Sequence, residues 1–116
     1  MTIYETSFET FDNDVLARSY EIPVLVDFWA DWCAPCRVIA PVLERLLNEL
    51  GGSIRLAKLE VDEGENMKLA GHYRVRGFPT IILFHNGCEL GRFSGARPAN
   101  WIRHFIDEHV DLADPV

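Results

Sequence analysis

The chain has 116 residues, 48% of them hydrophobic and 25% charged, which is enough for one globular domain with a substantial core. Its 11 basic and 18 acidic residues give a net charge of -7, which argues against nucleic acid or an anionic membrane as the partner. Residues 1–9 contain no basic region followed by an apolar one, and no apolar stretch approaches the length of a membrane span, so we expect one cytoplasmic domain over residues 1–116.

The first half of the chain is predicted to alternate strand and helix. Residues 2–6 have the pattern of a short edge strand, and residues 9–18 that of a helix with one apolar side. Residues 23–29 predict a strand that is buried on both faces, because nearly all of them are apolar. Apolar residues then recur at helical spacing over residues 34–50, and Gly51-Gly52 marks the end of that helix.

The alternation continues in the second half. Residues 54–61 are predicted as a third strand and residues 66–73 as a short helix. Residues 80–84 and 88–93 read as strands on either side of Asn86-Gly87, the strongest short-range signal for a β-hairpin. Strands that alternate with helices indicate an α/β fold.

The C-terminal part is predicted to be a last helix that begins near Pro98. Residues 111–116 are expected to be a frayed tail. The apolar stripe of the helix consists of Trp101, Ile102, Phe105, Ile106 and Val110.

A pair of cysteines lies where the predicted buried strand turns into the long helix. Pro35 is typical of the first turn of a helix, and cysteines three apart there have Cα atoms roughly within the 4.4–6.8 Å that a disulfide needs. The partial positive charge of a helix N-terminus favours a thiolate. Cys33, the earlier and outer of the two, is therefore the expected nucleophile, and Cys36 its partner.

The alternatives for this pair are a structural disulfide, half of a zinc site, or two ordinary buried cysteines. A zinc site needs about four ligands, and the sequence offers no second Cys-x-x-Cys and no His-x₃-His. No metal is therefore expected. Cys88, after the hairpin turn, has no evident partner and is interpreted as a bystander thiol, with a regulatory or dimerising role as the alternative.

Asp27 is an acid in the middle of the strand predicted to be buried on both faces. Its burial should raise its pKa, because desolvation disfavours the charged form. The alternative is a carboxylate paired for stability with Lys58, which interrupts the apolar alternation of the neighbouring strand. Because buried ion pairs are weak stabilisers, a purely stabilising role explains these two residues less well than a functional one.

These residues resemble a thioredoxin along nearly the whole chain. The centre of the resemblance is Trp32-Cys33-Ala34-Pro35-Cys36, in which alanine stands where the family usually has glycine. Six further pieces follow the family's order: Val26-Asp27-Phe28-Trp29-Ala30, Ala40-Pro41, Ala57-Lys58-Leu59, Val61-Asp62, Arg76-Gly77-Phe78-Pro79-Thr80 and Asn86-Gly87.

The resemblance implies a thioredoxin fold, a five-stranded mixed sheet flanked by four helices, and a protein that reduces disulfides in other proteins. Cys33 and Cys36 would form the redox-active disulfide, with Asp27 assisting proton transfer to and from Cys36 and Lys58 tuning Asp27. Pro79 would be in cis and face the cysteines, and the Phe78 backbone would pair with an extended substrate segment. The rest of the implied substrate surface consists of Trp32, Ala34, Pro35 and Gly95.

The resemblance also implies that electrons come from a separate thioredoxin reductase, either an NADPH-dependent flavoenzyme or a ferredoxin-dependent enzyme. The sequence has no Gly-x-Gly-x-x-Gly motif, so we expect no bound cofactor. Two other functions stay open. One is an oxidase or isomerase of the same fold, and the other is a binding module that keeps the cysteines incidentally.

Overall fold

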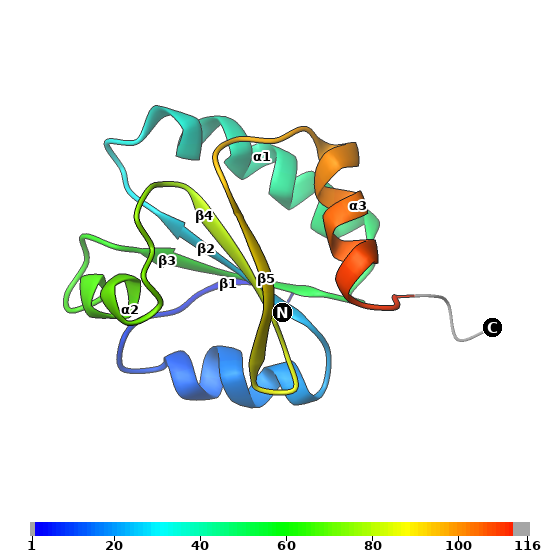
Figure 1. The fold of residues 1–116 in the computed structure, drawn as a ribbon, viewed down its shortest axis with the longest axis horizontal. Coiled ribbons are helices and arrows are strands. Elements are labelled where there is room, and N and C mark those ends of the chain that lie inside the picture. The colour runs from blue at the N-terminus through cyan, green and yellow to red at the C-terminus, as the bar shows by residue number, and fades with distance from the viewer. Residues whose placement is uncertain (1, 113–116) are drawn as a thin grey trace.

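The computed structural model describes residues 2–112, and its centre is a five-stranded sheet in the order β1-β3-β2-β4-β5 (Figure 1). β1, β3 and β2 are parallel, whereas β4 is antiparallel to β2 and β5 to β4, so the predicted mixed sheet is confirmed. The elements are β1 (Ile3–Glu5), η1 (Asp12–Ala17), η2 (Arg18–Tyr20), β2 (Val24–Trp29), α1 (Ala34–Glu49), β3 (Arg55–Glu60), α2 (Met67–His72), β4 (Thr80–His85), β5 (Cys88–Ser94) and α3 (Ala99–His109).

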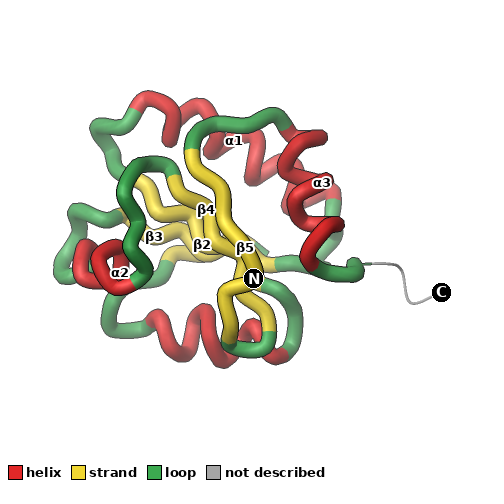
Figure 2. The backbone as a smooth tube through the Cα atoms, viewed as in Figure 1, coloured by secondary structure: helices red, strands yellow, loops and turns green. Residues whose placement is uncertain are grey.

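Helices cover both faces of the sheet, α1 and α3 on one side and η1, η2 and α2 on the other (Figures 1 and 2). Side chains of the central strand β2 alternate between the two layers. Val26 and Phe28 belong to the buried cluster under η1 and α2, and Leu25 to the cluster under α1 and α3. By the same alternation Asp27 lies on the α1 side of the sheet.

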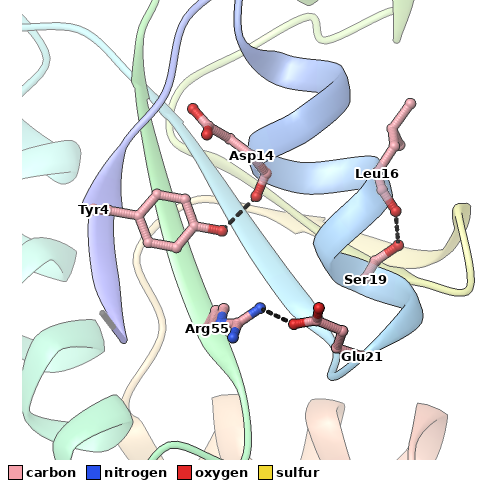
Figure 3. Close-up of polar contacts among 6 residues, drawn as sticks. All are labelled: Tyr4, Asp14, Leu16, Ser19, Glu21 and Arg55. Atoms are coloured by element: carbon pink, nitrogen blue, oxygen red, sulfur yellow. Dashed lines mark hydrogen bonds and ion pairs between the residues drawn. The ribbon is translucent and has the colours of Figure 1, made fainter.

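The first helix departs from the prediction. Instead of one regular helix over residues 9–18, the chain forms a π-helical segment, η1, followed by a 3₁₀ turn, η2. Side-chain hydroxyls donate hydrogen bonds to backbone carbonyl oxygens of this segment, and these bonds compete with the regular i to i+4 hydrogen bonds of an α-helix. Figure 3 shows its polar contacts: Tyr4 Oη donates to the Asp14 carbonyl oxygen (2.5 Å), Ser19 Oγ donates to that of Leu16 (2.6 Å), and Arg55 pairs with Glu21 (3.2 Å).

The predicted hairpin and last helix are confirmed with small shifts. Asn86 and Gly87 both have positive φ, 53° and 78°, as a tight two-residue turn requires. α3 begins at Ala99, with Pro98 as the residue before it. The tail predicted over residues 111–116 lies outside the described residues from 113 onward. Among residues 2–112, no helix is long and apolar enough to cross a membrane.

Candidate active site

Cys33 and Cys36 form a disulfide at the start of α1. Cys33 is the residue before the first helical turn, with extended backbone angles (φ −95°, ψ 108°), and its Cα lies 5.3 Å from that of Cys36. The predicted position and Cα spacing of the pair are therefore correct. The backbone N–H of Cys36 donates to Cys33 Sγ at 3.2 Å, so a helix-terminal donor is already directed at the sulfur that we expected to be the nucleophile.

The surroundings of the two sulfurs differ less than their sequence positions suggest. In the disulfide form Cys33 is 5% exposed and Cys36 3% exposed, whereas Ala34 and Pro35 between them are exposed. Exposure alone therefore does not distinguish the attacking thiol from its partner. The distinction rests on the hydrogen bond to Cys33 and on its place at the helix start.

Asp27 is buried on β2, with an exposed fraction of 1%, and its Oδ1 has no hydrogen-bond partner among residues 2–112. Desolvation raises the pKa of Asp27 to about 7, while the positive charge of Lys58 opposes the rise and the negative charge of Glu44 adds to it. The direction agrees with the sequence-based expectation. Such a pKa allows the carboxyl group both to accept and to release a proton near neutral pH.

Lys58 is the direct neighbour of Asp27 in the register of β3 and β2. Its ammonium nevertheless contacts Glu44 on α1, with Lys58 Nζ 3.3 Å from Glu44 Oε2. The alternative reading of Asp27 as one half of a stabilising ion pair is thus not supported. Glu44 was not anticipated, because it is one of several charged residues of α1 and nothing in the sequence indicates that it meets β3.

The loop before β4 lies beside the cysteine loop. The Phe78–Pro79 peptide bond is cis, in agreement with the implied geometry. The Trp32 ring, 63% exposed, stands edge-on to Phe78 with 5.9 Å between the ring centroids. Phe78 in turn packs against the buried cluster that contains both cysteines. Trp32 and Phe78 therefore form a continuous apolar surface next to the disulfide.

The remaining predicted surface residues differ in their exposure. Pro79 is buried, and its carbonyl oxygen accepts the N–H of Gly95 at 3.0 Å. Gly95 has a φ of 85°, a conformation that favours glycine. Pro79 and Gly95 thus shape the edge of the surface through their backbone. Trp32 also donates from Nε1 to Asp62 Oδ2 at 2.6 Å, a contact that the sequence does not indicate, because the two residues are 30 positions apart.

The third cysteine lies away from the disulfide, and the described residues form no metal site. Cys88 is a free, exposed thiol next to the hairpin turn, at the other end of β4 from Pro79. Within residues 2–112, no group of three or more His, Cys, Asp or Glu side chains is arranged to hold a metal ion.

Comparison with known proteins agrees with this geometry. The thioredoxin family model matches residues 2–108. Thioredoxin C-2 of Corynebacterium nephridii is 43% identical over 109 residues, which cover 94% of this chain and 97% of that protein. A thioredoxin of Chlorobaculum thiosulfatiphilum is 39% identical over 107 residues, covering 92% and 95%. A thioredoxin of Haemophilus influenzae is 40% identical over 99 residues, covering 85% and 91%.

The Cys33–Cys36 pair is accordingly a redox-active disulfide, and the protein is a thiol–disulfide oxidoreductase that reduces disulfides of other proteins. In its dithiol form it donates two electrons to a disulfide-containing substrate, and a reductase returns them. The chain belongs to the thioredoxin family.

Proposed function

We propose that Cys33 is the attacking thiol and Cys36 the resolving thiol of the exchange. The Cys33 thiolate attacks one sulfur of the substrate disulfide, forming a mixed disulfide while the second substrate sulfur leaves as a thiolate. Cys36 then passes its proton to Asp27 and attacks Cys33 Sγ. The first substrate sulfur leaves, and the Cys33–Cys36 disulfide closes. The observation that carries this assignment is the N–H of Cys36 directed at Cys33 Sγ at the helix start.

Alkylation of the reduced protein tests the assignment of Cys33. In a brief treatment with iodoacetamide at pH 7, we expect Cys33 to react about tenfold faster than Cys36, because it has the larger thiolate fraction. Peptide mapping measures each thiol separately. Cys88, which is exposed, serves as the internal reference for an accessible thiol outside the site. Equal rates at Cys33 and Cys36 would refute the assignment.

We also propose that the surface formed by Trp32 and Phe78 docks an extended segment of the substrate beside Cys33, with Ala34, Pro35 and Gly95 at its edge. The exposure of the Trp32 ring supports this role, since large exposed aromatics commonly serve as contacts. The hydrogen bond to Asp62 and the contact with Phe78 restrict the ring, which reduces the entropy lost on binding. Pro79 follows Phe78 through a cis peptide bond and is proposed to fix the backbone of this surface.

Replacing Trp32 with alanine tests the docking role. We expect Trp32→Ala to slow the reduction of insulin about five- to thirtyfold, the effect of losing an interface aromatic, and to leave the reduction of a small aromatic disulfide within about twofold. Tyr20→Ala is the matched control, because Tyr20 is similarly exposed (66%) but lies beside the hairpin turn at Gly87. A Trp32→Ala variant that loses both activities in equal proportion would contradict docking.

We further propose that residues 1–116 act as one domain in the cytoplasm. A dithiol that reduces other proteins requires a compartment in which thiols are kept reduced. The electron donor is proposed to be a thioredoxin reductase, either an NADPH-dependent flavoenzyme or a ferredoxin-dependent enzyme. Assaying the purified protein with each reductase separates the two.

A further inference from the structure

Glu44 connects the helix that carries the cysteines to the strand beside Asp27. It lies on α1, and its Oε2 is 3.3 Å from Nζ of Lys58 on β3. The same ammonium lies 5.7 Å from the centre of the Trp29 ring, at the end of β2. Lys58 thus has one acid beside it in the sheet, Asp27, and one above it on the helix, and it contacts the one on the helix.

We propose that Glu44 is a positioning residue of the exchange reaction, which holds the Lys58 ammonium away from Asp27 and so sets how readily Asp27 takes up a proton. The inference rests on the proposed function, in which Asp27 is the group that exchanges a proton with Cys36. It assigns to Glu44 a role that neither the motif nor the local sequence indicates.

The charges around Asp27 support this arrangement. Of the described residues, only Lys58 and Glu44 act on its proton affinity through their charge, in opposite directions. Its register partner on β4 is Ile81, which is apolar. The buried side chains of α1 and α3 on this face are likewise apolar, including Ile39, Leu43, Ile102 and Ile106. In the disulfide form, in which neither Cys33 nor Cys36 carries a proton, no other ionisable side chain of the described residues affects this carboxyl group, so it responds to where the Lys58 ammonium is held.

A merely stabilising role does not account for the Glu44–Lys58 pair. The Lys58 side chain is 23% exposed and that of Glu44 46%, and ion pairs that water still reaches add little to the stability of a fold. The position of the Lys58 ammonium matters more for the proton affinity of Asp27 than for the stability of the fold. The Asp27 carboxyl group is buried, so an approaching ammonium would act on it with little screening. Glu44 therefore affects proton transfer more than folding.

Replacing Glu44 with glutamine should lower the pH at which Asp27 titrates. In Glu44→Gln the ammonium of Lys58 is released toward Asp27 and a negative charge disappears, and both changes favour the ionised carboxylate. The titration midpoint of Asp27 should fall by about half a pH unit or more, measured by carboxyl ¹³C NMR on the reduced protein. Glu49→Gln is the matched control, since it removes the same charge from an exposed position of the same helix, and it should move the midpoint much less.

A double variant separates the holding of Lys58 from the charge of Glu44 alone. In a Lys58→Met background no ammonium is left to hold, so Glu44→Gln should lower the Asp27 midpoint by less than it does in the wild type. An equal fall in both backgrounds, or equal effects of Glu44→Gln and Glu49→Gln, would overturn the proposal.

The pH profile of mixed-disulfide resolution by Cys36 distinguishes this inference from the proposed function. If the Asp27 midpoint falls as expected and the profile follows it, both are supported. If the midpoint falls and the profile stays where it was, Glu44 has the role inferred here and the proton-transfer role of Asp27 is wrong.

Discussion

Cys33→Ser is expected to lower the rate of insulin reduction by about a thousandfold or more, the scale on which the loss of an essential nucleophile acts. Serine keeps the size of the side chain, but its hydroxyl is not ionised near neutral pH and forms no disulfide. The variant should remain folded, because the disulfide closes only a short loop at the start of α1. The measurement is the dithiothreitol-coupled precipitation of insulin at pH 7.

Cys88→Ser is the control for this experiment. It makes the same chemical change at an exposed thiol next to the hairpin turn and should keep the wild-type rate within about twofold. A large loss in Cys88→Ser, or substantial activity left in Cys33→Ser, would mean that the exchange does not run through Cys33.

Asp27→Ala is expected to stabilise the protein increasingly as the pH rises. In the unfolded chain this carboxyl ionises near its ordinary pKa of 3.8, whereas in the folded protein its pKa is about 7. Below pH 3.8 both states hold the proton, and between the two values only the folded state holds it, so wild-type stability falls as the pH rises through this window. Above about pH 7 the penalty is complete and constant.

The raised pKa of Asp27 determines how much stability the Asp27→Ala variant gains. A pKa difference of about three corresponds to about 4 kcal/mol at 1.36 kcal/mol for each pH unit. The stability of Asp27→Ala relative to the wild type should therefore improve by about 3–4 kcal/mol between pH 4 and pH 8. Urea unfolding at four pH values across this range measures it. A stability difference that does not change with pH would show that the Asp27 pKa is not raised in the fold.

The same variant should slow turnover, because the proton acceptor for Cys36 is lost. We expect a decrease of up to about a hundredfold in insulin reduction near pH 7, in the range of general base catalysis. Stopped-flow measurement of mixed-disulfide resolution locates the effect in the Cys36 step. Rates that equal the wild type from pH 6 to pH 9 would remove Asp27 from the mechanism.

Most strands and helices could be predicted because their signals are local, whereas the five-stranded mixed sheet was expected only from the family resemblance. The apolar run of β2, the helical spacing in α1 and the Asn86-Gly87 turn each fall within one element. The first helix was predicted near its observed place, but its π-helical and 3₁₀ geometry could not be predicted, because it involves a distant residue: Tyr4 of β1 donates to the carbonyl oxygen of Asp14.

In the candidate site, too, features set within one strand or helix were predictable and long-range contacts were not. Cys33, Cys36 and the burial of Asp27 were predictable, since position in one strand and one helix determines them. The cis bond at Pro79 was expected only from the family resemblance. The pairing of Lys58 with Glu44 could not be predicted, because it requires the packing of α1 against β3, and residues 14 apart in sequence have no periodic relation that reveals it.

The most direct test of the exchange mechanism is to map the mixed disulfide trapped by Cys36→Ser. Without Cys36 the first step runs and the second cannot, so the variant incubated with an oxidised substrate protein should accumulate a covalent complex. Mass spectrometry of the digested complex identifies the linked cysteine. The mechanism predicts that Cys33 carries the substrate and that dithiothreitol releases it, whereas a complex linked through Cys88, or no complex at all, would contradict it.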